Sequence, residues 1–286
     1  MPELAVDATT IGLVLVAALL HASWNALTKA SGDPLVNIAV VSSTGGLVAL
    51  PFMFLLPLPV GDAWFWLAFS AVIHFVYQLS LARMYQLGDL SQVYPIARGL
   101  APLGVAVLGV LFAQEELARH QIAGLLFASC AIIVLGRSGR HRPSNREAVG
   151  MALMTALLIG LYTYSDAQGV RSVARPESFI AWSFFFGCVP FALATMALRR
   201  RAGLESLRRN GLRAVGGGLM ATLGYGIALW AMSKTAMAAV ASLRESSVLF
   251  AALLGTTLLG ESFGRVRAVA ALVLVVGLVL VQLRFV

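Results

Sequence analysis

The feature that most constrains this chain is a series of apolar stretches, each about twenty residues long and separated by short polar joints. The hydrocarbon core of a bilayer is about 30 Å thick, and a helix of about 20 residues crosses it. Ten crossings fit into 286 residues and leave only short connectors. We therefore predict an all-α membrane protein with ten transmembrane helices. The expected spans are residues 9–28, 35–57, 64–87, 90–113, 120–136, 148–168, 177–198, 212–233, 236–259 and 265–284.

The composition agrees with a membrane protein and argues against several other classes. Charged residues make up 12% of the chain, whereas soluble domains usually carry about 25%. The net charge of +8 does not point to nucleic acid, because the basic residues lie mainly in two short connectors. Cys130 and Cys188 lie within apolar stretches and form neither a metal-ligand spacing nor a disulfide framework. We expect no cofactor, no metal site and no nucleic-acid partner.

The chain divides into two similar halves. Its longest basic connector, residues 137–146, falls near the midpoint and predicts one five-helix repeat over residues 1–141 and a second over 142–286. Since each half has an odd number of spans, the second copy is expected to be inverted in the membrane. Inverted repeats around a site near the midplane are a recurring transporter architecture. A gap-free shift of 146 residues aligns Arg98 with Arg244, Gly109 with Gly255, Glu115 with Glu261, and Arg119 with Arg265.

The Lys and Arg residues of the short loops predict the orientation. Thirteen of them fall on one side of the expected bundle and five on the other. Cytoplasmic loops carry the excess of Lys and Arg in membrane proteins. We therefore expect the richer side to be cytoplasmic and both termini to be periplasmic, in a multi-pass protein of a bacterial inner (plasma) membrane.

Polar and aromatic side chains form stripes on three of the expected helices. Unpartnered polar groups are costly in lipid, so they normally face protein or a wet cavity. Spacings of three and four residues place each stripe on one helical face. We predict that the stripes line a central cavity that binds a solute; the alternative is that they hold helices together through hydrogen bonds. The stripes contain His21, Trp24 and Asn25 in the first span, His74, Tyr77 and Gln78 in the third, and Tyr162, Ser165 and Asp166 in the sixth.

Further candidate site residues are charged or aromatic. Asp166 could bind an ammonium group or carry a proton, or it could be an acid at a helix end that reaches water. Arg98, which lies between two prolines and one turn from Tyr94, and Arg244 are the deep cationic candidates. Either could hold a carboxylate through its planar fork, or both could form structural ion pairs. Trp230 and Tyr225 add aromatic surface to the expected cavity, or belong to an interfacial aromatic belt.

These motifs resemble the drug/metabolite transporter superfamily, specifically its ten-helix EamA-type carriers, over essentially the whole chain. The resemblance rests on Tyr94-Pro95-Ile96-Ala97-Arg98-Gly99, on Leu243-Arg244-Glu245-Ser246-Ser247, and on Glu115 and Glu261 ahead of the last helix of each half. The segments 21–26 and 164–166 are similar to one branch, the exporters of amino acids and related metabolites. The resemblance implies a basket-like bundle around a central cavity that opens alternately to each side. Because Glu115 and Glu261 fall at the membrane edge, where an acid favours a helix N-terminus, we expect both to be structural.

One predicted function and two alternatives follow. We expect a secondary transporter that exports small zwitterionic metabolites, amino acids in particular, aromatic ones among them, by alternating access. A lipid-linked carrier flippase is the first alternative, and it would need a side opening between helices. An intramembrane enzyme is the second, but the sequence offers no matched acid pair, metal motif or nucleophile, so we expect no enzyme. The expected partners are a small-molecule substrate and membrane lipid, and ten spans could enclose a cavity within one monomer.

Overall fold

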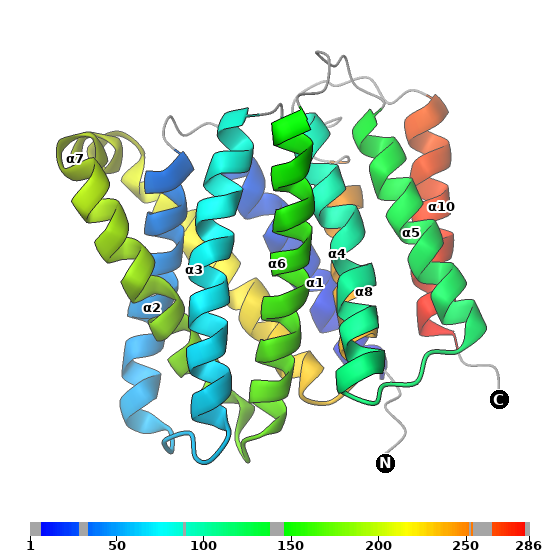
Figure 1. Ribbon diagram of the computed structural model, residues 1–286, viewed down its shortest axis with the longest axis horizontal. Coiled ribbons are helices and arrows are strands. Elements are labelled where there is room, and N and C mark those ends of the chain that lie inside the picture. The colour runs from blue at the N-terminus through cyan, green and yellow to red at the C-terminus, as the bar shows by residue number, and fades with distance from the viewer. Residues whose placement is uncertain are drawn as a thin grey trace.

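The computed structural model describes residues 7–28, 34–87, 90–137, 146–251, 253 and 265–283. All regular secondary structure in these ranges is helical, which confirms the predicted all-α class. The helices pack in one bundle, and α1 begins and α10 ends at the same end of it, which we call the terminal end (Figure 1). The helices are α1 (Ala8–Thr28), α2 (Pro34–Leu55), α3 (Ala63–Leu87), α4 (Leu90–Phe112), α5 (Arg119–Arg137), α6 (Arg146–Arg171), α7 (Pro176–Met232), α8 (Met237–Arg244) and α10 (Arg265–Gln282).

Seven helical segments within the described ranges are long and apolar enough to cross a membrane. Five of them are α1 to α4 and α6, and the other two are the parts of α7 over Pro176–Arg199 and Gly211–Met232. α7 has two parts because its backbone leaves the helical range at Arg199, where φ is −127° and ψ is 28°. The chain turns back there, at the end of the bundle opposite the terminal end (Figure 1). Shorter apolar helices cover residues 119–135 and 268–282. The number and length of these apolar helices are those of a multi-pass membrane protein.

Several predictions concern residues outside the described ranges. The expected ninth span, residues 236–259, is described as α8 and a helical stretch over 247–251, and most of the remainder lies outside the described residues. Gly255, Glu261 and the boundary between residues 141 and 142 also lie outside them. The ten-helix count and the inverted repeats therefore stay predictions.

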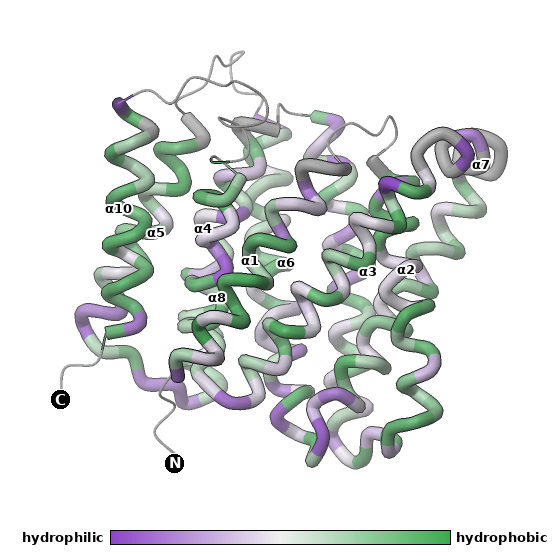
Figure 2. The backbone as a smooth tube through the Cα atoms, turned by 180° about the vertical axis from the view of Figure 1, so that it is seen from behind, coloured by the Kyte–Doolittle hydropathy of each residue, from purple (hydrophilic) through white to green (hydrophobic). Residues whose placement is uncertain are grey.

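The outer surface of the bundle is apolar. Large hydrophobic side chains such as Leu47, Phe54 and Leu223 are more than half exposed. Figure 2 shows hydrophobic residues along most of each helix and hydrophilic residues gathered at the bend of α7. A soluble monomer rarely exposes so large an apolar surface, whereas lipid tails solvate it.

Small residues bring α5 and α10 into backbone contact. A methyl group on Gly277 would lie 2.7 Å from the backbone nitrogen of Ala128 and 2.7 Å from the carbonyl oxygen of Gly124. A methyl group on Gly124 would lie 2.6 Å from the carbonyl oxygen of Gly277. Helix association in lipid depends on such close packing, because lipid supplies no hydrophobic driving force. We call the contact of Gly124, Ala128 and Gly277 the α5–α10 seam.

An ion pair at the terminal end holds the start of α8 to α4 and α6. Oε1 of Glu115 accepts hydrogen bonds from Nη2 of Arg171 at 2.8 Å and from the backbone nitrogen of Met237 at 3.0 Å. Arg171 also donates to the carbonyl oxygens of Met232 at 2.9 Å and Thr235 at 2.8 Å. The carboxylate thus satisfies an open N–H in the first turn of α8, not of α5, which follows it in the sequence. We call Glu115, Arg171 and Met237 the Glu115 latch.

Candidate functional site

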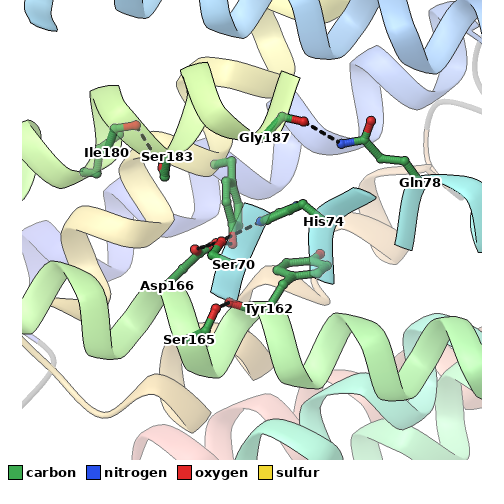
Figure 3. Close-up of polar contacts among 10 residues, drawn as sticks. Ser70, His74, Gln78, Tyr162, Ser165, Asp166, Ile180, Ser183 and Gly187 are labelled. Carbon is green, nitrogen blue, oxygen red and sulfur yellow. Dashed lines mark hydrogen bonds and ion pairs between the residues drawn. The ribbon is translucent and has the colours of Figure 1, made fainter. Parts of the chain in front are cut away.

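Asp166 on α6 accepts hydrogen bonds from side chains of two neighbouring helices, α3 and α7. Its Oδ1 accepts from the hydroxyl of Ser70. Its Oδ2 accepts from the hydroxyl of Tyr225 at 2.6 Å and lies 3.0 Å from Nε2 of His74. Figure 3 shows Ser70, His74 and Asp166 pointing toward one another. We call these four residues the Asp166 cluster. Because Asp166 is completely buried, the structure contradicts the alternative in which this acid reaches water at the helix end.

Aromatic rings surround His74. Its ring stacks on that of Tyr162, with centroids 4.3 Å apart and planes 25° apart. Tyr77 and Tyr225 each meet Tyr162 edge-on, at centroid distances of 5.0 Å and 6.0 Å. The side chain of His74 keeps 17% of its surface exposed, although Asp166 beside it has none. The helices therefore close completely over the carboxylate but leave part of the His74 ring exposed.

Arg98 forms a buried ion pair that connects α4 to the residue after α8. Its Nη2 lies 2.7 Å from Oε1 of Glu245, and the two side chains are 7% and 3% exposed. In so dry a place each charge depends on the other, because water cannot solvate either of them. For Arg98, the structure thus favours the structural ion pair over a contact with substrate. Glu245 Oε2 and the hydroxyls of Ser246 and Ser247 are buried without a hydrogen-bond partner in the described ranges.

Arg244 differs from Arg98 in its surroundings. Its guanidinium carbon lies 5.1 Å from the ring centroid of Tyr225, a cation–π contact. The residue is 8% exposed, and no carboxylate of the described chain lies within ion-pair distance of it. A buried cation without a carboxylate is costly in a membrane. Arg244 is therefore available to bind an anionic group of a ligand.

The helix breaks directly after Arg244. α8 ends at this residue, Glu245 and Ser246 form a turn, and helix resumes at Ser247. The N–H groups of Glu245 and Ser246 donate to carbonyl oxygens three residues earlier, at 2.9 Å and 3.1 Å. These bonds tighten the helix locally, while Glu245 keeps right-handed helical dihedral angles, and a 3₁₀ turn inside a helix often marks a hinge.

His21 brings α1 to the same region. Nε1 of Trp24 donates to Nδ1 of His21 at 3.2 Å, and the hydroxyl of Tyr94 lies 3.5 Å from its Nε2. Asn25 donates to the backbone carbonyl of His21 at 2.7 Å. Tyr94 lies one turn before Arg98 on α4. The stripes on α1, α3 and α6 therefore converge on the part of the bundle that contains the two arginines.

Three predicted site residues make other contacts. Gln78 connects α3 to α2 and α7, since it accepts from a hydroxyl on α2 and donates to the carbonyl of Gly187 at 3.3 Å. Ser165 is buried and donates to a backbone carbonyl on its own helix at 3.2 Å. Trp230 lies near the terminal end, with Nζ of Lys234 4.7 Å from its ring centroid. The contacts of Gln78 agree with the helix-holding alternative, and that of Trp230 agrees with an interfacial position.

Ser70 and Glu245 complete the site but are absent from the predicted set, and Tyr225, which the sequence offered only as aromatic surface, also binds Asp166. Ser70 precedes His74 by four residues, so the helical spacing that identified the stripe on α3 also places Ser70 on it. Glu245 has no such signal, because its partner Arg98 is distant in the sequence. Within the described ranges, no group of three or more His, Cys, Asp or Glu side chains could hold a metal ion.

Comparisons with known proteins agree with a transporter fold. The EamA-like transporter family matches the chain twice, over residues 8–137 and 146–283. Among solved structures, one crystal structure matches this chain with a TM-score of 0.76; its description, "Crystal structure of protein", names no particular protein. The match covers 96% of this chain and 98% of the other, and the two sequences are 16% identical, so the likeness is one of fold. No curated protein matches the sequence.

Proposed function

Because this chain belongs to the EamA-like transporter family, we propose that it is a secondary transporter that exports small zwitterionic metabolites, in particular amino acids. Members of this family are transporters rather than enzymes. The proposal adds a substrate class, a direction and a mechanism to that assignment. It also places the chain in a bacterial inner membrane with both termini in the periplasm, as the loop charges predict.

The observation that carries the proposal is the position of Arg244. This cation is buried beside the Tyr225 ring, and no carboxylate of the described part of the chain lies within ion-pair distance of it, since the neighbouring Glu245 pairs with Arg98. A substrate carboxylate would supply the missing negative charge, and a guanidinium can bind both of its oxygens. One such cation suits one carboxylate, whereas a nucleotide sugar would need a cluster of Lys and Arg.

The rest of a zwitterionic substrate would lie against aromatic rings. Tyr162 and Tyr77 offer ring faces and edges beside the Asp166 cluster, and Tyr225 links that cluster to Arg244. An ammonium group is attracted to such faces and to the negative charge behind them. Trp24 and Tyr94 would extend the aromatic surface from the side of α1 and α4. Neutral hydrogen-bonding groups such as Asn25 would tolerate several substrates.

We propose that transport proceeds by rocking of two inverted halves, residues 1–141 and 142–286, around this site. The break after Arg244 and the prolines of α4 supply points where helices can bend.

A counterflow assay tests the proposal. Purified protein is reconstituted into vesicles loaded with one unlabelled amino acid, and uptake of the same labelled amino acid is measured across a panel. Arg244→Gln removes a charge-assisted hydrogen bond worth about 1.5–3 kcal/mol, so apparent affinity should fall roughly 10–150-fold. The control is Arg83→Gln, because Arg83 forms an exposed ion pair with Glu147 away from the site. Absence of counterflow with every amino acid, or equal affinity in the two variants, would overturn the proposal. Movement of a labelled lipid in place of amino acids would favour a flippase.

A further inference from the structure

The Asp166 cluster contains a titratable pair that the binding of a carboxylate on Arg244 does not use. We propose that His74 and Asp166 form a proton-binding site, and that a proton entering there drives export by competing with the substrate's ammonium group. This inference rests on the proposed function, because it assigns the energy source for that same site.

The hydrogen bonds of the pair fix which atom can take the proton. In the proposed site Asp166 is a carboxylate, which only accepts hydrogen bonds, so the hydrogen of neutral His74 lies on the Nε2 that is 3.0 Å from Asp166. Ser70 and Tyr225 also donate to this carboxylate. The second ring nitrogen of His74, Nδ1, has no hydrogen-bond partner among the described residues. The His74 side chain is 17% exposed, so we place the incoming proton on Nδ1, the ring nitrogen that does not face Asp166.

The charges around the pair determine how protonation changes the net charge that a bound substrate meets. Without it, the pair has one net negative charge; with it, an imidazolium faces a carboxylate and the pair is neutral. Arg98 does not compensate for the change, because Glu245 already neutralises it. The other titratable or charged groups that face the pair are Tyr77 from α3, Tyr162 from α6, Tyr225 from α7, and Arg244 behind the ring of Tyr225.

A zwitterionic substrate couples to this proton through its ammonium group. The rings of Tyr162 and Tyr225 lie against His74, so an ammonium group on those rings is close to the pair. It is attracted while the pair is negative and loses that attraction when the pair is neutral. By linkage, substrate binding must weaken proton binding by the same factor.

The resulting cycle is an antiport in which each step balances. On the outer side, a proton moves from water to Nδ1 of His74, and the substrate leaves. After the site turns inward, the proton moves from Nδ1 to cytoplasmic water, and a cytoplasmic substrate binds. One proton enters for each substrate exported, and Asp166 remains a carboxylate throughout.

The test measures protons and substrate in the same vesicles. Full-length protein is reconstituted with the pH dye pyranine inside, and the labelled amino acid that gives the fastest counterflow is loaded with it. Efflux of that amino acid should acidify the interior. His74→Gln can still donate to Asp166 from its amide but has no second ring nitrogen, so the ratio of protons to substrate should fall at least about tenfold. The matched control is His120→Gln, a histidine at the start of α5 that bonds to the carbonyl of Leu283, and its ratio should equal that of the native protein.

The outcomes separate this inference from the proposed function. Counterflow without proton movement in the native protein would overturn the proton site and leave the transporter in place. Absence of counterflow with every amino acid would overturn both. An unchanged proton ratio in His74→Gln would show that the proton binds elsewhere.

If His74→Gln transports too slowly for the ratio of protons to substrate to be measured, a binding measurement replaces the vesicle assay. Equilibrium binding of the same labelled amino acid to detergent-solubilised protein is compared at about pH 6 and about pH 8, on either side of the usual histidine range. Native binding should be about tenfold weaker at the lower pH, and the variant should bind equally at both. Loss of binding at both pH values would overturn the inference, because it would make His74 a substrate ligand instead of the proton carrier.

Discussion

Replacing Glu115 with alanine tests whether the Glu115 latch stabilises the terminal end of the bundle. The side chain of Glu115 is 6% exposed and that of Arg171 is 23% exposed. Breaking a fully buried pair costs about 3–5 kcal/mol, but Arg171 keeps two carbonyl acceptors and some contact with water, which reduces the cost to about 1–2 kcal/mol. The open N–H at the start of α8 adds about 1 kcal/mol. The expected loss in the free energy of unfolding is therefore about 2–3 kcal/mol.

Thermal unfolding in detergent, followed by tryptophan fluorescence, measures this loss. With about 2–4 °C for each kcal/mol in a protein of this size class, Glu115→Ala should lower the midpoint by roughly 4–12 °C. The neighbouring acid Glu116 is exposed, so Glu116→Ala is the control and should shift the midpoint little. Glu115→Gln should fall between the two, because it keeps an acceptor oxygen and removes the charge. Equal midpoints for the two alanine variants would refute the reasoning that the latch carries stability.

Three further predictions concern the seam, the site and the topology. Gly277→Ala places a methyl group against two backbone atoms, so it should lower the free energy of unfolding by about 1–3 kcal/mol. Gly150→Ala, which meets no atom within 4 Å, is its control, and equal unfolding midpoints would contradict the tight seam. Trp24→Ala should reduce counterflow at least about tenfold while the protein still inserts, because it removes aromatic surface worth more than 1 kcal/mol; unchanged counterflow would remove Trp24 from the site. A C-terminal reporter that is active only in the cytoplasm should stay silent, and strong activity would contradict the predicted orientation.

The helices were predictable because lipid imposes a simple length rule. The expected spans 9–28, 64–87 and 148–168 lie within three residues of α1, α3 and α6 at every end. Periodicity also predicted the stripes on these helices, since it depends only on residues close in sequence. The break after Arg244 was not predicted, because neither glycine nor proline marks it. It coincides with a buried ion pair to α4, a contact that sequence spacing cannot show.

The assignments of individual charged residues depended on tertiary partners. The sequence left Arg98 and Arg244 equivalent, and only the structure distinguishes them, by placing Glu245 against one and the Tyr225 ring against the other. Asp166 likewise needed its three donors, two of which lie on α3 and one on α7. Residue types alone predicted that aromatic rings gather at the site. They could not show that the carboxylate of Asp166 is buried next to those rings.

The α5–α10 seam also limits how the bundle can change shape. Neighbouring helices usually slide past each other when side chains between them switch rotamers. At Gly124 and Gly277 no side chain intervenes, so sliding would drive one peptide group into another. α5 and α10 therefore move as one rigid unit, and shear must occur among the other helices, where tyrosine and histidine rings separate the backbones.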